Sequence, residues 1–163
     1  MHLSETARPR RWIPFLARWI LGAVFLYLGA NKALHPIEFL KVVRQYDITN
    51  QPLLLNGIAA LLPWLEIFTA VALLTGRALR GSALICLGML LPFSGAILHR
   101  ALALHAAQGT PFCAIRFDCG CGTGEVVICH KLIENSLLIL LSLLLLKTSR
   151  PNPAPDRAPV AAV

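Results

Sequence analysis

The sequence predicts an all-α integral membrane protein, a four-helix bundle with a cysteine-bearing loop between the third and fourth helices. Two observations support this fold class. Hydrophobic residues make up 56% of the 163 residues and charged residues only 14%, whereas about a quarter of the residues in soluble domains are charged. The apolar side chains also gather in four runs, each close to the roughly 20 residues that cross a bilayer. A single membrane domain is therefore expected.

The four spans are expected at about residues 12–34, 53–75, 81–100 and 126–147. Residues 1–11 form a polar tail. Residues 148–163 contain prolines and few large apolar side chains, which predicts a disordered second tail. The first apolar run follows two arginines, as in some secretion signals, but it is long and no small-residue cleavage site follows it. We therefore expect it to be retained as a helix.

The distribution of Lys and Arg predicts the orientation in the membrane. Eight basic residues flank one side of the spans, namely Arg8, Arg10, Arg11, Arg77, Arg80, Lys147, Arg150 and Arg157. Five flank the other side, namely Lys41, Arg44, Arg100, Arg116 and Lys131. Because the more basic side usually faces the cytoplasm, both termini are predicted to be cytoplasmic and the cysteine loop periplasmic, in a bacterial inner membrane. The same residues form no basic stripe, so the net charge of +7 does not indicate a nucleic-acid partner.

One face of the first span combines small and polar residues at helical spacing: Arg18, Gly22, Phe25, Gly29 and Lys32. Glycines on such a face allow a neighbouring helix to approach closely. The pattern fits a packing face, with Lys32 extending towards the membrane surface, as well as it fits a functional site.

Glu66 lies within the second span, where a carboxyl group must either pair with a cation or take up a proton. At about 1.5 Å per residue, Glu66 lies roughly 14 Å and Arg18 roughly 9 Å from the cytoplasmic ends of their helices. These depths predict an Arg18–Glu66 pair. A protonatable or quinone-contacting Glu66 is the alternative.

A second polar group is expected near the outer face. It comprises His99 at the end of the third span, Lys32 at the end of the first, and Cys129, His130, Lys131, Glu134 and Asn135 at the start of the fourth. Lys131 and Glu134 are three residues apart, which favours an ion pair on one helix face. A functional role for Glu134 is the alternative.

Cysteines give the sharpest chemical signal. Cys119-Gly120-Cys121 places two thiols one residue apart, and a disulfide across so small a ring departs from relaxed geometry and favours exchange. We predict Cys119 and Cys121 as the reactive pair, with Cys113 and Cys129 as candidate resolving or disulfide partners. Four cysteines allow three connectivities, which the sequence leaves open. Zinc binding and purely structural disulfides are alternatives, and zinc is disfavoured because its sites prefer two to four residues between cysteines. Cys86, inside the third span, is expected to be a small buried side chain.

The helix 1 pattern, the segment Pro63-Trp64-Leu65-Glu66 and the Cys-Gly-Cys motif before the last span together resemble the methylamine utilisation protein MauE family, within the DoxX-like membrane proteins. The resemblance covers roughly residues 15–147. It implies a four-helix membrane protein associated with redox processes. In the MauE branch it implies help in maturing the disulfide-rich periplasmic subunit of methylamine dehydrogenase, and in DoxX relatives quinone-dependent thiol or sulfur oxidation.

The functional hypothesis is therefore a membrane protein that supports disulfide formation or thiol exchange in a periplasmic client, with a quinone as the candidate cofactor. Its expected partners are membrane lipid and either the client or a thioredoxin-like protein. A quinone-linked thiol-disulfide oxidoreductase is one form of this hypothesis. The alternatives are a non-enzymatic assembly partner with structural disulfides and a small transporter or metal-handling protein.

Overall fold

The computed structural model describes residues 12–46, 51–120 and 124–149. Four long helices dominate: α1 (Trp12–Leu34), α3 (Pro52–Thr75), α4 (Leu79–Gln108) and α5 (Ile128–Thr148). Each is long and apolar enough to cross a membrane. The predicted all-α membrane bundle is thereby confirmed. The two predicted tails, apart from residues 148 and 149, and Cys121 lie outside the described residues.

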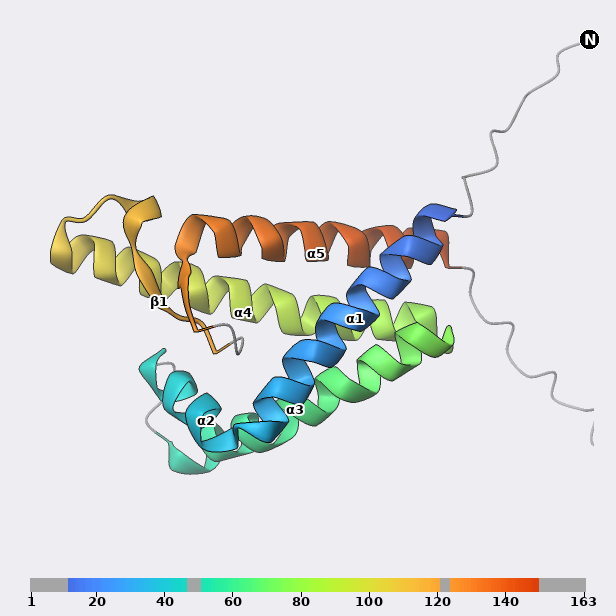
Figure 1. Cartoon of the computed structure of the whole chain (residues 1–163), viewed down its shortest axis with the longest axis horizontal. Helices are drawn as coiled ribbons and strands as arrows, with labels where there is room; N and C mark the ends of the chain where they lie inside the picture. Colours follow the sequence, from blue (N-terminus) through green and yellow to red (C-terminus); the bar gives the residue numbers. More distant parts are fainter. Residues whose placement is uncertain (1–11, 47–50, 121–123, 150–163) are drawn as a thin grey trace, which may run out of the picture.

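The four helices form two antiparallel pairs, α1 with α3 and α4 with α5 (Figure 1). The pairs lie close together where α1 begins and α5 ends. They diverge towards the other end, which carries the cysteine residues between α4 and α5 (Figure 1). We call this the cysteine end.

Glycine explains how closely α1 approaches α3. A Cβ atom added to Gly29 would lie 2.9 Å from Glu66 Cβ, from Ile67 Cγ1 and from the Pro63 carbonyl oxygen. Real side chains do not tolerate such distances, so only glycine fits there. The small-residue face predicted for the first span is thus the α1–α3 contact.

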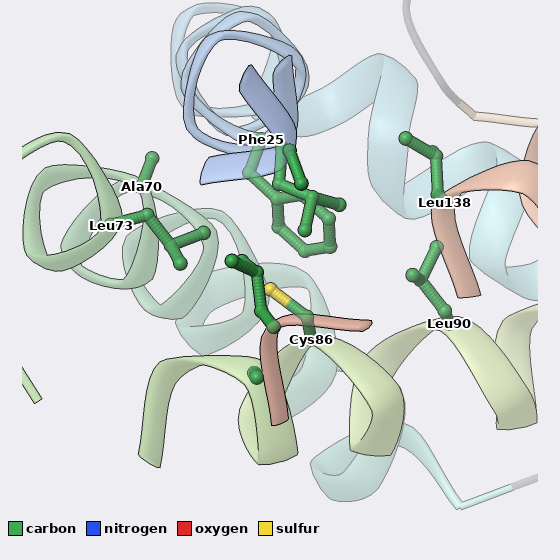
Figure 2. Close-up of a cluster of buried hydrophobic side chains, with 10 residues drawn as sticks. Phe25, Ala70, Leu73, Cys86, Leu90 and Leu138 are labelled. Atoms are coloured by element: carbon green, nitrogen blue, oxygen red, sulfur yellow. The ribbon is translucent and has the colours of Figure 1, made fainter. Parts of the chain in front are cut away.

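A hydrophobic core joins the two pairs away from the cysteine end. Its members come from all four long helices, and Phe25, Ala70, Leu73, Cys86, Leu90 and Leu138 are labelled in Figure 2. Cys86 is completely buried in this cluster and is a free thiol. Its predicted role as a small buried side chain is confirmed.

Short elements that the sequence analysis did not anticipate fill the cysteine end. Helix α2 (Pro36–Gln45) follows α1, and a 3-10 turn, η1 (Phe112–Ala114), precedes an antiparallel hairpin of β1 (Arg116–Asp118) and β2 (Glu125–Val127). Helix α4 runs past the predicted residue 100 and ends at Gln108, where Gly109, with a φ of 65°, forms a left-handed helix cap. A second buried cluster forms where α2, the hairpin, α4 and α5 meet, and it includes Val42, Tyr46, Ile97, Phe117, Cys119 and Ile128.

Candidate functional site

A disulfide fixes the start of the chain between α4 and α5, residues 109–127, which we call the cysteine segment. Cys113 in η1 bonds to Cys129 in the first turn of α5, with a Cα–Cα distance of 5.1 Å. The hairpin lies between these two cysteines in the chain, so the bond closes its base onto α5. Of the three connectivities left open by the sequence, the structure therefore contains the one that joins Cys113 to Cys129.

Cys119 is held at the end of β1 and is also disulfide-bonded. Its exposed fraction is 0%. The Tyr46 hydroxyl, at the end of α2, donates a hydrogen bond of 3.0 Å to the Cys119 carbonyl oxygen. Burial raises the pKa of Tyr46, so this hydroxyl keeps its proton and remains a donor. The contact ties the cysteine segment to α2.

Cys119 lies in a tight turn between Asp118 and Gly120. The Gly120 amide donates to the Asp118 carboxylate at 2.8 Å, and Gly120 has a φ of 73°. A Cβ atom at Gly120 would lie 3.0 Å from Val42 Cγ1. Glycine is needed here both for the left-handed backbone and for the close approach to α2.

Glu66 pairs with Lys32, so the predicted Arg18–Glu66 pair is wrong. The Lys32 ammonium donates to Glu66 Oε1, and both side chains are buried. The prediction failed because it measured depth from each helix end as if the ends were level. In the structure, Gly76, which caps the C-terminus of α3, lies against the Arg18 guanidinium. The N-terminus of α1 therefore extends about 9 Å beyond the C-terminus of α3. That offset brings Glu66 level with the far end of α1.

Arg18 has a different environment. Its guanidinium also lies over the Phe15 ring, 5.3 Å from the ring centre. It therefore sits at the C-terminal end of α3, where the helix dipole favours a cation. This position suits a structural role at the end opposite the cysteines.

The second predicted polar group is only partly assembled. Lys131 Nζ donates to Glu134 Oε2 at 2.9 Å, which confirms the expected i,i+3 pair. Asn135 is buried and donates to the Ser94 hydroxyl at 3.1 Å. His99 and His130, by contrast, are exposed on the bundle surface. They therefore do not belong to the buried polar group, which the sequence alone did not indicate.

Two small spaces adjoin the Lys32–Glu66 pair, and each has a volume of about 40 Å³. An inner cavity lies between the helix pairs, lined by apolar side chains together with Lys32, Glu66, Lys131 and Asn135. A cleft lies under the cysteine segment and is lined by Asn31, Lys32, His35, Glu38, Phe39, Val42, Asp118 and Gly120. Lys32 lines both spaces. The cleft could not be predicted from the sequence, because α2, which forms one of its walls, was not predicted.

The fold and this site define a multi-pass membrane protein that carries a disulfide-bonded segment over one end of a four-helix bundle. The family model described as methylamine utilisation protein MauE matches residues 10–148, which is most of the chain. The chain therefore belongs to the MauE family of methylamine utilisation membrane proteins. No curated protein and no solved structure matches it.

Proposed function

We propose that this protein is an inner-membrane accessory factor that exchanges disulfides with the thiols of a periplasmic client, the methylamine dehydrogenase light subunit. The observation that carries the proposal is the disulfide-bonded segment held at one end of a membrane bundle. Disulfides persist on the oxidising side of a membrane. Family membership supplies the methylamine context, and the predicted orientation supplies the compartment.

The proposed chemistry is thiol–disulfide exchange. A client thiolate attacks one sulfur of a disulfide in this chain, that S–S bond breaks, and a mixed disulfide forms. The client's second thiolate then displaces the remaining sulfur, which oxidises the client and leaves two thiols here. Because Cys119 is fully buried, the sequence-predicted partner Cys121 is the proposed point of attack, and Cys119 is the sulfur released in the first step.

Regenerating the disulfide requires a two-electron oxidant, and the resemblance suggested a quinone. The inner cavity beside Glu66 does not fit a quinone ring. Its volume of about 40 Å³ leaves room for about two or three water molecules. We therefore assign no step to a quinone at Glu66.

A non-enzymatic assembly partner is the second candidate function. The complete burial of Cys119 and the covalent closure by Cys113–Cys129 favour it, because stable disulfides are usually inaccessible. In that case the segment is a rigid docking surface for the client. A transporter, the third hypothesis, has less support, because Lys32 with Glu66 and Lys131 with Glu134 form ion pairs within the spans.

Thiol trapping separates the first two candidates. Cells are exposed to graded thiol and disulfide buffers and quenched with a maleimide that adds mass. Exchange predicts that Cys119 and Cys121 change state with redox poise, whereas Cys113 and Cys129 stay bonded. If all four cysteines remain oxidised until the protein is denatured, the assembly partner becomes the better account.

The proposed topology has a separate test. An impermeant maleimide applied to intact cells after reduction should label the segment between α4 and α5. Single-cysteine variants that retain only Cys121 or only Cys86 provide the matched comparison, since Cys86 is buried within the bundle. Labelling of Cys121 only after the cells are permeabilised would place the segment in the cytoplasm and remove the basis for exchange.

A further inference from the structure

The buried Lys32–Glu66 pair lies beside two small spaces, and Lys32 lines both of them. Towards the cysteine end, Lys32 lines the cleft with His35, Glu38 and Asp118. Towards the bundle centre, it lines the inner cavity with Glu66. The pair thus separates a cleft under the cysteine segment from a space within the membrane-spanning region.

The Glu66 carboxyl group makes fewer hydrogen bonds than a purely structural ion pair would require. Its Oε1 atom accepts from Lys32, but its Oε2 atom is buried and has no hydrogen-bond partner among the residues the structure describes. The residue is only 5% exposed. A carboxylate with a free lone pair at this depth is costly. Apolar side chains would hold α1 against α3 at least as well.

The inner cavity gives Glu66 room for water that can relay a proton to it from the cleft. It has room for about two or three water molecules, and Lys131 and Asn135 line it from α5. Water there would be in reach of the polar atoms that α1, α3 and α5 contribute. The α4 residues that line it, Met89, Leu90 and Phe93, are apolar.

We infer that Glu66 is a proton-exchanging site that is reached from the cysteine end, through the cleft and past Lys32. A proton from water in the cleft neutralises the Glu66 carboxylate, and the Lys32 ammonium loses its partner and turns towards the cleft. The inference concerns the membrane interior. It holds whether or not the cysteines exchange with a client.

The charges around the pair favour this movement of Lys32. Besides Lys32, a second cation, Lys131 of α5, lines the inner cavity, and it is already paired with Glu134. On the cleft side, Lys32 faces Glu38 of α2, Asp118 of β1 and His35. The two carboxylates can therefore receive the ammonium when Glu66 is neutral.

Infrared difference spectroscopy on the full chain in lipid nanodiscs tests the protonation itself. As the pH is lowered, a carboxylic-acid C=O band should grow, and it should be absent in Glu66→Gln. In Lys32→Met, the ratio of protonated to ionised Glu66 at a given pH should rise by at least about tenfold, since a nearby cation favours the carboxylate. If no pH-dependent band assignable to Glu66 appears in either the wild type or Lys32→Met, the pair is structural and the inference fails.

Deuterium exchange tests the route. On mixing with D₂O, the Glu66 band should shift promptly in the wild type. Val42 lines the cleft, so Val42→Phe should fill it and slow the shift several-fold. Ile37 lies on the same helix with 71% exposure, and Ile37→Phe should leave the rate unchanged. An undiminished rate in a folded Val42→Phe variant, judged by its intact Cys113–Cys129 bond, would refute access through the cleft.

Discussion

Removing one member of the Lys32–Glu66 pair should destabilise the protein much more than removing both. Each side chain is buried, with exposed fractions of 5% and 7%, so Lys32→Met leaves an unpaired carboxylate and Glu66→Leu an unpaired ammonium. Breaking a buried pair in this way costs about 3–5 kcal/mol. Two opposite charges about 4 Å apart, at an effective dielectric constant of about 20, interact by about 4 kcal/mol, which agrees with that range.

The double variant Lys32→Met/Glu66→Leu should recover most of this loss, because two apolar side chains of similar size can replace a buried pair at little net cost. The assay is SDS-induced unfolding in mild detergent, followed by tryptophan fluorescence, with the four proteins forming a double-mutant cycle. Lys131 and Glu134 provide the matched control. The Glu134 side chain is 44% exposed, so that cycle should give a coupling of only about 0.5 kcal/mol. Additive losses for Lys32 and Glu66, each below about 1 kcal/mol, would refute the buried-pair reasoning.

Three further expectations concern helix packing and the cysteine end. Gly29→Leu should lower stability by about 1–3 kcal/mol in thermal scans, because its side chain would separate α1 from α3. Gly57→Leu should not lower stability, because the space around Gly57 is open. Equal effects of the two substitutions would contradict the packing account. Cys129→Ser removes a disulfide with a sequence separation of 16, at a cost of about 3 kcal/mol. The loss of this bond should expose residues 109–127 to limited proteolysis. Cleavage unchanged from the wild type would contradict the role of the disulfide in holding this segment. Because the pKa of Tyr46 is raised on folding, its stabilising effect is complete below pH 10.0 and is lost as the pH rises further. Tyr46→Phe should abolish that pH dependence and cost about 1 kcal/mol. If the unfolding midpoints of the variant change with pH as those of the wild type do, the contact is disproved.

The membrane fold could be predicted because bilayer burial imposes a simple pattern. Four apolar runs of spanning length gave the helices, and the glycine spacing of the first run gave its packing face. Cys86 and the Lys131–Glu134 pair followed from local spacing alone, since an apolar span buries a small thiol and residues three apart share a helix face. In each of these cases, neighbours along the chain determine the result.

The cysteine end could not be predicted in the same way, because it depends on contacts between distant segments. Glu66 pairs with Lys32 rather than Arg18 owing to the offset between α1 and α3, and no local pattern encodes that offset. Helix α2 has only 10 residues, too few to form a span, and only its docking on Cys119 and Gly120 reveals it as the wall of a cleft. The exposure of His99 and His130 likewise depends on how α4 and α5 are rotated.

The exchange proposal is tested most directly by the disulfide state of the methylamine dehydrogenase light subunit in cells that carry Cys119→Ser/Cys121→Ser. Thiol trapping followed by mass spectrometry of the client should show that its cysteines stay reduced, although the variant inserts into the membrane at normal levels. Cys86→Ser, the matched control, should support full oxidation of the client. A fully oxidised client in the presence of the double variant would contradict thiol exchange through this segment.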